Sequence, residues 1–307
     1  MTNQKHLISI VGPTGIGKTS LSIALAQHFN TEIISADSRQ FYKEMQIGTA
    51  APTPEELNAA PHHFIHHKSV LDTYNVGDFE KDALTLLNQL FVNHNVVIMV
   101  GGSGLYVDAV TKGLDDFPQI DPTVRETLND ELTNKGLEHL QNQLKTLDTI
   151  AFNQIAMDNP HRVIRALEIC IGSGQPYSSF LNKPKPKRPF KTISIGLDAD
   201  RPIIYERINT RVDQMMALGL LDEVKTLQHL QHQNALNTVG YSELFKVLNG
   251  EWTLDFAVSE IKKNSRRYAK RQLTWFKKNE NILWFDYKTP LENITASIAK
   301  KLAEDSI

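Results

Sequence analysis

The chain has a single cysteine, Cys170, among its 307 residues. One thiol cannot form an internal disulfide, and it excludes a zinc site built on several cysteines. No run reaches about 18 apolar residues, and the first residues, MTNQKH, lack the apolar stretch of a secretory signal. We therefore expect a cytoplasmic protein without a membrane partner. The sequence also lacks an excess of charge of either sign, with a formal net charge of −2, so total charge points to no partner.

A phosphate-binding loop is the most informative motif that is present. Residues 12–19 read GPTGIGKT, a complete G-x-x-x-x-G-K-[ST] pattern, between the apolar run 7–11 and the helix-patterned segment 19–29. We expect backbone N–H groups to cradle phosphate, Lys18 to reach the terminal phosphates and the Thr19 hydroxyl to hold Mg²⁺. The predicted phosphate-binding residues are Gly12, Pro13, Thr14, Gly15, Ile16, Gly17, Lys18 and Thr19.

The remaining pattern is typical of an α/β protein. Helix-patterned segments separate the first three apolar runs, which favours a P-loop-like parallel sheet with helices on both faces. Five runs predict buried strands: 7–11, 32–35, 96–100, 192–197 and 282–285.

About ninety residues between the third and fourth runs contain no strand-like stretch. Three segments there have helical patterning: 124–132, 137–147 and 162–171. We predict an all-helical insertion domain at 118–189, which leaves 1–117 and 190–307 as the catalytic core. The tract KPKPKRP at 183–189 excludes a helix because its prolines alternate. Its basic residues belong either to a solvated linker or to a surface that contacts a polyanion.

Polar residues follow two further predicted strands, and the carboxyl ends of parallel strands normally carry the site. Asp37 follows the run 32–35, where it is either a catalytic base or Mg²⁺ ligand, or a turn cap. The segment GGSG at 101–104 is either a second anion-binding turn offering the Ser103 hydroxyl, or an ordinary glycine turn.

Two clusters of side chains have competing interpretations. The stretch PHHFIHH at 61–67 suggests a metal, but no cysteine or clear carboxylate completes a site, so a structural role is favoured. Residues 261–279 contain eight basic residues and no acidic one, which favours contact with a phosphate backbone over a solvated face. Arg201, Arg207 and Arg211 are spaced to lie near one helix face, where they would close over a diphosphate.

The motifs, in this order, resemble the tRNA dimethylallyltransferase (tRNA isopentenyltransferase) family of bacterial type. The resemblance spans nearly the whole chain. It rests on GPTGIGKT (12–19), ISADSRQFYKEMQIGTA (34–50), PHHF (61–64), YNVGDF (74–79), VGGSGLY (100–106), NPHRVIRALEI (159–169), RINTRVDQMMALGLLDEV (207–224), VGYSEL (239–244) and AKRQLTWF (269–276).

The resemblance implies a P-loop core with a helical insertion, in agreement with the patterns above. It implies transfer of a dimethylallyl group from dimethylallyl diphosphate to N6 of the adenosine 3′ of the tRNA anticodon, giving N6-isopentenyladenosine and pyrophosphate. It further implies that the P-loop holds the prenyl diphosphate and not ATP. Mg²⁺ is the expected cofactor, the tRNA anticodon stem-loop the expected partner, and a monomer the expected state.

The same resemblance assigns roles to individual residues. Asp37 would be the general base, and Ser103 would supply the family's hydroxyl. Lys18, Thr19 with Mg²⁺, and Arg211 would neutralise the departing pyrophosphate. The predicted tRNA-contacting residues are Asp37, Ser38, Arg39, Gln40, Ser103, Arg125, His161, Arg162, Val163, Ile164, Arg165, Thr238, Val239, Gly240, Tyr241 and Ser242.

Three positions depart from the family pattern. Ser103 replaces the usual threonine, His161 a common glutamine and Ala51 a frequent lysine. Three alternatives remain open: prenylation of a free adenine nucleotide, a small-molecule kinase, and a non-enzymatic RNA-binding NTPase. The helical insertion and the basic stretch argue against the first, because a mononucleotide requires neither.

Overall fold

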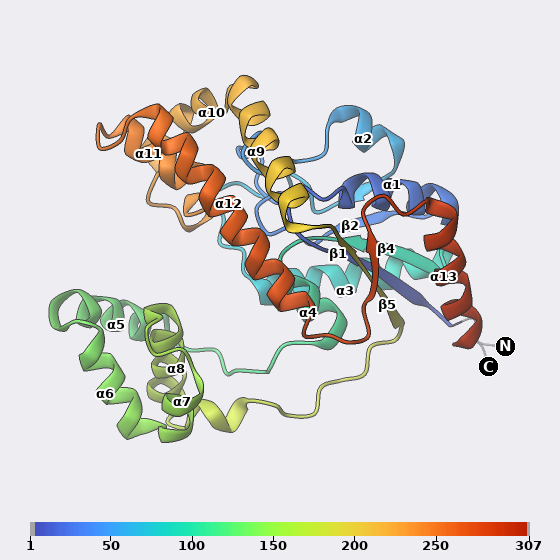
Figure 1. Ribbon diagram of the computed structural model, residues 1–307. Helices are drawn as coiled ribbons and strands as arrows, with labels where there is room; N and C mark the ends of the chain where they lie inside the picture. Colours follow the sequence, from blue (N-terminus) through green and yellow to red (C-terminus); the bar gives the residue numbers. More distant parts are fainter. Residues whose placement is uncertain (1–3, 306–307) are drawn as a thin grey trace. The chain divides into compact units, whose positions relative to one another are not determined.

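The computed structural model describes residues 4–305. Its central feature is a parallel sheet with the strand order β3-β2-β4-β1-β5-β6 (Figure 1). The strands are β1 (His6–Val11), β2 (Ile33–Ser35), β3 (His62–His63), β4 (Val96–Val100), β5 (Lys191–Asp198) and β6 (Leu283–Asp286). The predicted α/β class is confirmed, and each of the five predicted strands is present. The sequence did not predict β3, because two residues are too short to show a period.

Helices cover both faces of this sheet because its strands alternate two sets of apolar side chains. Ile8 and Ile10 pack with Leu25 of α1 (Lys18–Phe29) and Ile298 of α13 (Leu291–Glu304). On the opposite face, β1 packs against α3 (Val76–Asn93), α4 (Gly104–Lys112) and α12 (Leu254–Phe276). The other core helices are α2 (Pro54–Ala59), α9 (Arg201–Ala217), α10 (Leu220–Thr226), α11 (Tyr241–Leu248) and the 3₁₀ turns Gln228–Leu230 and Asn234–Leu236.

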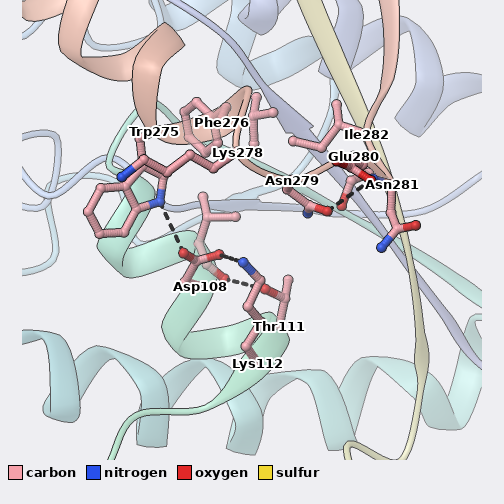
Figure 2. Close-up of a pocket in the computed structure, with 13 residues that line it drawn as sticks. Asp108, Thr111, Lys112, Trp275, Phe276, Lys278, Asn279, Glu280, Asn281 and Ile282 are labelled. Atoms are coloured by element: carbon pink, nitrogen blue, oxygen red, sulfur yellow. Dashed lines mark hydrogen bonds and ion pairs between the residues drawn. The ribbon is translucent and has the colours of Figure 1, made fainter. Parts of the chain in front are cut away.

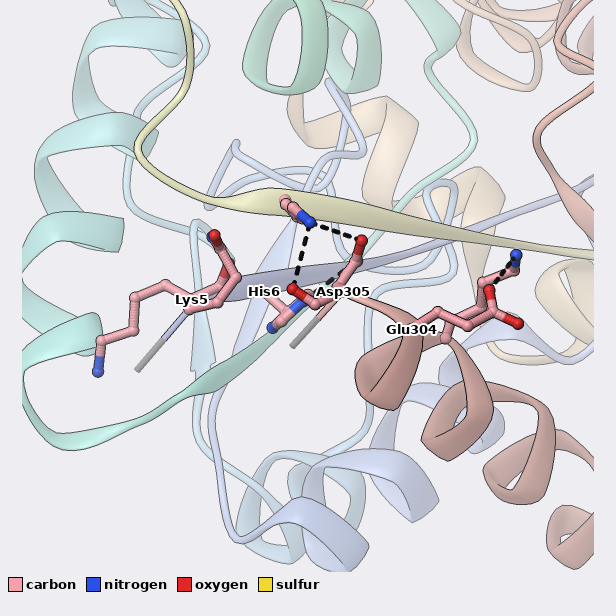
Figure 3. A network of polar contacts seen from close by, with 7 residues as sticks. Lys5, His6, Glu304 and Asp305 are labelled. Atoms are coloured by element: carbon pink, nitrogen blue, oxygen red, sulfur yellow. Dashed lines mark hydrogen bonds and ion pairs between the residues drawn. The ribbon is translucent and has the colours of Figure 1, made fainter. Parts of the chain in front are cut away.

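The C-terminal helix is attached to the first and fifth strands by ionic contacts (Figure 3). Asp305, next to the end of α13, lies with Oδ2 at 3.3 Å from Nε2 of the buried His6. Its Oδ1 accepts a hydrogen bond from Nζ of Lys191 at 2.7 Å. The Lys191 ammonium is the first cause that holds the pKa of Asp305 below its usual range. These contacts lie at the amino ends of β1 and β5, opposite to the edge that carries the motifs.

Residues 113–187 form a second compact unit, distinct from the core of residues 1–112 and 188–307. It contains α5 (Pro122–Lys135), α6 (Leu137–Leu147), α7 (Thr149–Gln154), α8 (Pro160–Ser173) and the 3₁₀ turn Tyr177–Phe180. Its own apolar core joins buried leucines of α5, α6 and α8. The helix α7 was not predicted, because six residues show less than two full helical periods. Residues 183–188, in the proline-alternating tract, form neither helix nor strand.

None of the helices within residues 4–305 combines the length and the apolarity that a membrane span requires.

Candidate active site

Three strand ends meet at one edge of the sheet and bring the motifs together. The N–H of Ala36, after β2, donates to the carbonyl of Val100 at 2.7 Å, and the N–H of Gly101, after β4, donates to that of Ile10 at 3.2 Å. The P-loop, Asp37 and the glycine turn 101–104 therefore emerge side by side, as the predicted topology requires.

The P-loop is held from outside by neighbouring elements. Gly12 has φ 144°, and a Cβ at this position would stand 2.5 Å from the carbonyl oxygen of Leu197. Arg207 on α9 donates from Nε to the carbonyl of Gly15 at 2.8 Å. Lys18, the first residue of α1, donates from Nζ to the carbonyl of Pro13 at 2.8 Å. The loop thus curves around the Lys18 side chain at the amino end of α1, where the helix dipole is positive. This arrangement is suited to binding anions.

The Lys18 ammonium lies in a buried, mixed-charge environment. Burial lowers the pKa of Lys18 to about 8, while nearby Asp37 raises it and Arg211 lowers it. Desolvation disfavours the charged form of Lys18. The negative charge of a bound phosphate would stabilise that charged form.

This environment predicts a pH dependence for anion binding. Only the protonated lysine attracts phosphate, so the affinity for pyrophosphate should fall as the pH rises through about 8. The Lys18→Arg variant remains charged throughout and should show a much flatter profile. Titration calorimetry between pH 6.5 and 9.5 checks this, and parallel profiles for the two proteins would contradict it.

Asp37 lies where two cavities meet. One cavity, of about 480 Å³, is lined by the P-loop, and the other, of about 460 Å³, is lined by α12 and the segment before α11. Asp37, Thr14 and Arg211 belong to the walls of both. The carboxylate also caps its own turn, because Oδ1 accepts the N–H of Arg39 at 3.1 Å. The base interpretation and the cap interpretation of Asp37 are therefore compatible.

Ser103 is brought next to Ser38, which follows Asp37. Its Oγ accepts the N–H of Ser38 at 3.2 Å and lies 3.2 Å from the Ser38 hydroxyl. Tyr268 on α12 lies close to the same serine and to Asp37, and burial raises the pKa of Tyr268 to about 12. The phenol is thus a neutral hydrogen-bonding group beside Asp37. Sequence reasoning counted Tyr268 only as an apolar anchor, because helical spacing does not reveal what lies opposite.

The arginines of α9 divide into two groups. Arg211 lines both cavities, and burial, followed by Arg207, lowers its pKa. Arg207 reaches the P-loop, as described above, whereas Arg201 is exposed at the start of the helix and lines neither cavity. Two of the three predicted arginines are therefore at the site.

Arg39 and Gln40 are used to hold loops. The guanidinium of Arg39 donates to the carbonyls of Asn234, Ala235 and Asn237 at 3.0–3.3 Å. The Gln40 amide donates to the carbonyls of Thr49 and Ala50 at 3.3 and 3.2 Å. Both side chains therefore shape the cavity walls, in addition to any contact with RNA.

The segment 238–242 reaches the second cavity except at one residue. Thr238, Val239, Gly240 and Ser242 line the cavity. Tyr241 is fully buried, and its hydroxyl donates to Glu223 at 2.6 Å. Because its side chain is buried, any contact of Tyr241 with RNA would use its backbone, and the contact of this segment with tRNA stays a prediction.

The predicted tRNA-contacting residues of the helical unit also divide by burial. His161 and Arg162 are exposed at the start of α8. Val163 and Ile164 are buried in the core of the unit, so their side chains support the helix, and the contact of the segment 161–165 with tRNA stays a prediction.

Two predicted arginines of this unit form an ion-pair cluster. Glu168 is buried and accepts from Arg125 Nε at 3.1 Å and Nη2 at 2.7 Å, and from Arg165 Nη1 at 2.9 Å. Although burial opposes ionisation of Glu168, the two guanidiniums hold its pKa below the usual range. Arg125 and Arg165 thus stabilise the unit, and their contact with tRNA stays a prediction.

The histidine stretch takes part in packing. Nε2 of His63 lies 2.6 Å from Oε2 of Glu32, and His67 packs edge-on against Phe41, Phe64 and Tyr74. Within residues 4–305, no group of three or more metal-binding side chains is assembled.

The basic stretch 261–279, formed by α12 and the residues after it, contains both paired and unpaired cations. Lys262 pairs with Asp213 at 2.6 Å, and Lys277 pairs with Asp198 at 2.7 Å. In contrast, four other basic residues are exposed and take part in none of the ion pairs found in residues 4–305: Arg267, Lys270, Arg271 and Lys278.

Trp275, near the end of the same helix, packs on the glycine turn although it is 40% exposed. Figure 2 shows Trp275 donating from Nε1 to Asp108 of α4, at 3.0 Å. A Cβ at Gly104 would stand 2.4 Å from the Trp275 ring, which explains the glycine there. The cavity beside this contact, about 450 Å³, shares no lining residue with the two at Asp37. Trp275 thus fixes the start of α4, next to Ser103.

Comparison with known proteins agrees with this site. The IPP transferase family model matches residues 40–279. A tRNA dimethylallyltransferase of Christiangramia forsetii is 58% identical over 297 residues, covering 97% of this chain and 98% of that protein. One from Flavobacterium johnsoniae is 58% identical over 304 residues, with the same coverage.

Solved structures give the same result. The tRNA isopentenylpyrophosphate transferase of Bacillus halodurans matches with a TM-score of 0.74 at 38% identity, covering 99% of this chain and 98% of that one. A eukaryotic dimethylallyltransferase acting on tRNA matches with a TM-score of 0.77 at 27% identity, covering 92% of this chain and 74% of that one. The chain therefore belongs to the IPP transferase family, as a member of bacterial type.

Proposed function

We propose that the chain transfers a dimethylallyl group from dimethylallyl diphosphate to N6 of the adenosine 3′ of the tRNA anticodon. The position of Asp37 between the P-loop cavity and the second cavity carries this proposal. The diphosphate occupies the first cavity, and an adenine extruded from the anticodon loop enters the second. The tRNA substrate agrees with the expected cytoplasmic location.

The chemistry follows from the residues around Asp37. The exocyclic amine of adenine is a weak nucleophile, so the reaction depends on stabilising the leaving group. The bond from N6 to C1 of the dimethylallyl group forms, the bond from C1 to the diphosphate oxygen breaks, and pyrophosphate leaves. Asp37 accepts the proton that N6 loses, while Lys18 and Arg211 neutralise charge on the pyrophosphate.

The donor set at the P-loop suits Mg²⁺. This ion takes one or two protein oxygens and fills its other positions with phosphate oxygens and water. The residues that would hold it are Thr19, with Asp37 nearby in the same cavity wall. When bound, Mg²⁺ would add positive charge at the leaving diphosphate.

The exposed residues of α12 are proposed to contact the tRNA backbone. Arg267→Ala and Lys270→Ala should each weaken tRNA binding and reduce the slope of log affinity against log salt by about 1. Lys262→Ala is the matched control, because this lysine is already paired with Asp213 and should leave the slope nearly unchanged. Filter binding from 50 to 300 mM salt measures the slopes. Equal slopes for all four proteins would show that tRNA does not contact this face.

A label-transfer assay tests the function itself. The protein is incubated with labelled dimethylallyl diphosphate, Mg²⁺ and unmodified tRNA that reads codons beginning with U, with AMP and ATP in parallel reactions. We expect label in tRNA alone. Label in AMP or ATP would indicate synthesis of a prenylated nucleotide, and absence of transfer would favour the kinase alternative.

A further inference from the structure

One carboxylate of the core holds three successive backbone amides of a neighbouring loop. Oε2 of Glu223, on α10, accepts the N–H groups of Gln46 and Ile47 at 3.0 and 2.8 Å. Oε1 accepts the N–H of Gly48 at 3.0 Å and the hydroxyl of Tyr241 at 2.6 Å. Successive amides that converge in this way form a backbone concavity suited to an anion, and hydrogen bonds to a carboxylate are stronger than neutral ones. Here the anion is a side chain of the protein itself.

The loop that this carboxylate holds, residues 46–50, borders the candidate active site. Every residue of the loop lines at least one of the two cavities at Asp37, and Thr49 and Ala50 line both. Glu223 itself lines neither cavity. Any effect of Glu223 on the reaction must therefore pass through the loop.

The last two residues of the loop are held by Gln40. Its amide donates to the carbonyls of Thr49 and Ala50, and Gln40 follows Asp37 by three residues. Ala50 has φ 48°, a left-handed conformation that a residue with a Cβ adopts only where its surroundings impose it. The loop thus connects Glu223 on α10 to the segment that carries Asp37.

Tyr241 holds the same loop by packing as well as by its hydroxyl. A Cβ on Gly48 would stand 2.5 Å from the Tyr241 ring, so a side chain there would have to displace a fully buried aromatic group. Burial, followed by the charge of Glu223, raises the pKa of Tyr241, which keeps the phenol protonated as a donor to that carboxylate. The buried ring and the carboxylate therefore fix the first half of the loop together.

We infer that Glu223 is a positioning residue for prenyl transfer, because it holds the loop 46–50 at the place where the two cavities meet. The inference rests on the proposed function, in which the diphosphate occupies one cavity and the adenine the other. A displacement of about 1 Å between reacting groups can cost about 10²-fold in rate. A loop that borders both cavities can therefore control how N6 and C1 meet, although the P-loop binds the diphosphate independently of it.

Variants at Glu223 distinguish positioning from a contribution to stability alone. Glu223→Ala should lower kcat per folded molecule by about 30-fold or more, measured with dimethylallyl diphosphate and tRNA both saturating. The affinity for Mg²⁺-pyrophosphate, measured by calorimetry, should stay within about threefold. Glu223→Gln keeps an acceptor for the amides of Gln46 and Ile47, and its kcat should recover to within about fivefold of the unmodified protein. Asp222→Ala is the matched control, because this neighbouring carboxylate is exposed, pairs with Lys225 and should leave kcat unchanged.

Hydrogen exchange tests the contact itself without the transfer reaction. In Glu223→Ala, the amides of residues 46–48 should exchange about tenfold faster or more, because their acceptor is gone. Unchanged exchange there, or a kcat per folded molecule within about threefold of the unmodified protein, would overturn the role of Glu223. A fall in pyrophosphate affinity equal to the fall in kcat would also overturn it, because that result indicates a general disturbance of the site.

Two further outcomes are separated by the same measurements. If Glu223→Ala does not fold, Tyr241→Phe removes one hydrogen bond to Glu223 and keeps the ring on Gly48. Its kcat should still fall by about threefold, and an unchanged kcat would overturn the inference. Absence of transfer to tRNA by the unmodified protein, together with faster exchange in Glu223→Ala, would instead contradict the proposed function.

Discussion

Replacing Asp37 with alanine should lower kcat for tRNA prenylation by about 10²–10⁴, the range expected for a general base. Asp37 is in the wall of both cavities and close to the Lys18 ammonium, and this position is the reason why we propose its carboxylate as the acceptor of the N6 proton. The KM for dimethylallyl diphosphate should change much less. Single-turnover kinetics with saturating tRNA separates the chemical step from binding.

Two further measurements distinguish a role of Asp37 in proton transfer from a role in holding its loop. Asp37 also accepts the N–H of Arg39, so Asp37→Asn, which keeps an acceptor oxygen for that turn, should preserve the loop and still lose most of the rate. Binding of tRNA to both variants should stay within about threefold of the unmodified protein. A parallel loss of tRNA affinity and rate in Asp37→Asn would mean that the residue acts on the RNA-binding loop and not on the proton.

The second large effect is expected at Lys18. Lys18→Met removes the buried cation beside Pro13 and Gly102 and should lower kcat/KM by about 10²–10³, as loss of one preorganised charge-stabilising donor does. The affinity for pyrophosphate should fall with it, because the same ammonium is proposed to neutralise the charge of this product. Steady-state kinetics with varied dimethylallyl diphosphate, and calorimetry with Mg²⁺-pyrophosphate, measure the two changes.

Folding and RNA binding serve as controls for Lys18→Met. The lysine is desolvated, so a neutral side chain of similar length should leave the melting temperature equal or higher. The affinity for tRNA alone should remain within about threefold. A kcat/KM near that of the unmodified protein would show that the leaving diphosphate is neutralised elsewhere, with Arg211 the first alternative.

Local signals determined much of this protein. Two patterns were sufficient to predict the α/β class and the edge of the sheet that carries the site. One is the phosphate loop between a buried strand and a helix, and the other is the alternation of apolar runs with helical segments. The same rule brought Asp37 next to the P-loop, because parallel strands place their carboxyl ends together. Strand β3 and helix α7 were not predicted from the sequence, because such short elements have too few residues to show a period.

Only the tertiary structure decided what each polar side chain touches. Tyr241, Val163 and Ile164 lie within RNA-contacting motifs of the resemblance, yet their side chains are buried. The basic helix α12 was interpreted as an RNA face, and on its buried side Gln272 accepts the N–H of Thr14 in the P-loop while Tyr268 lies close to Ser103. Spacing along a helix tells which residues share a face, whereas the partner opposite that face comes from segments more than 150 residues away in the chain. The sequence thus determined the elements and the chemistry available, and long-range packing selected which groups remain free for the substrate.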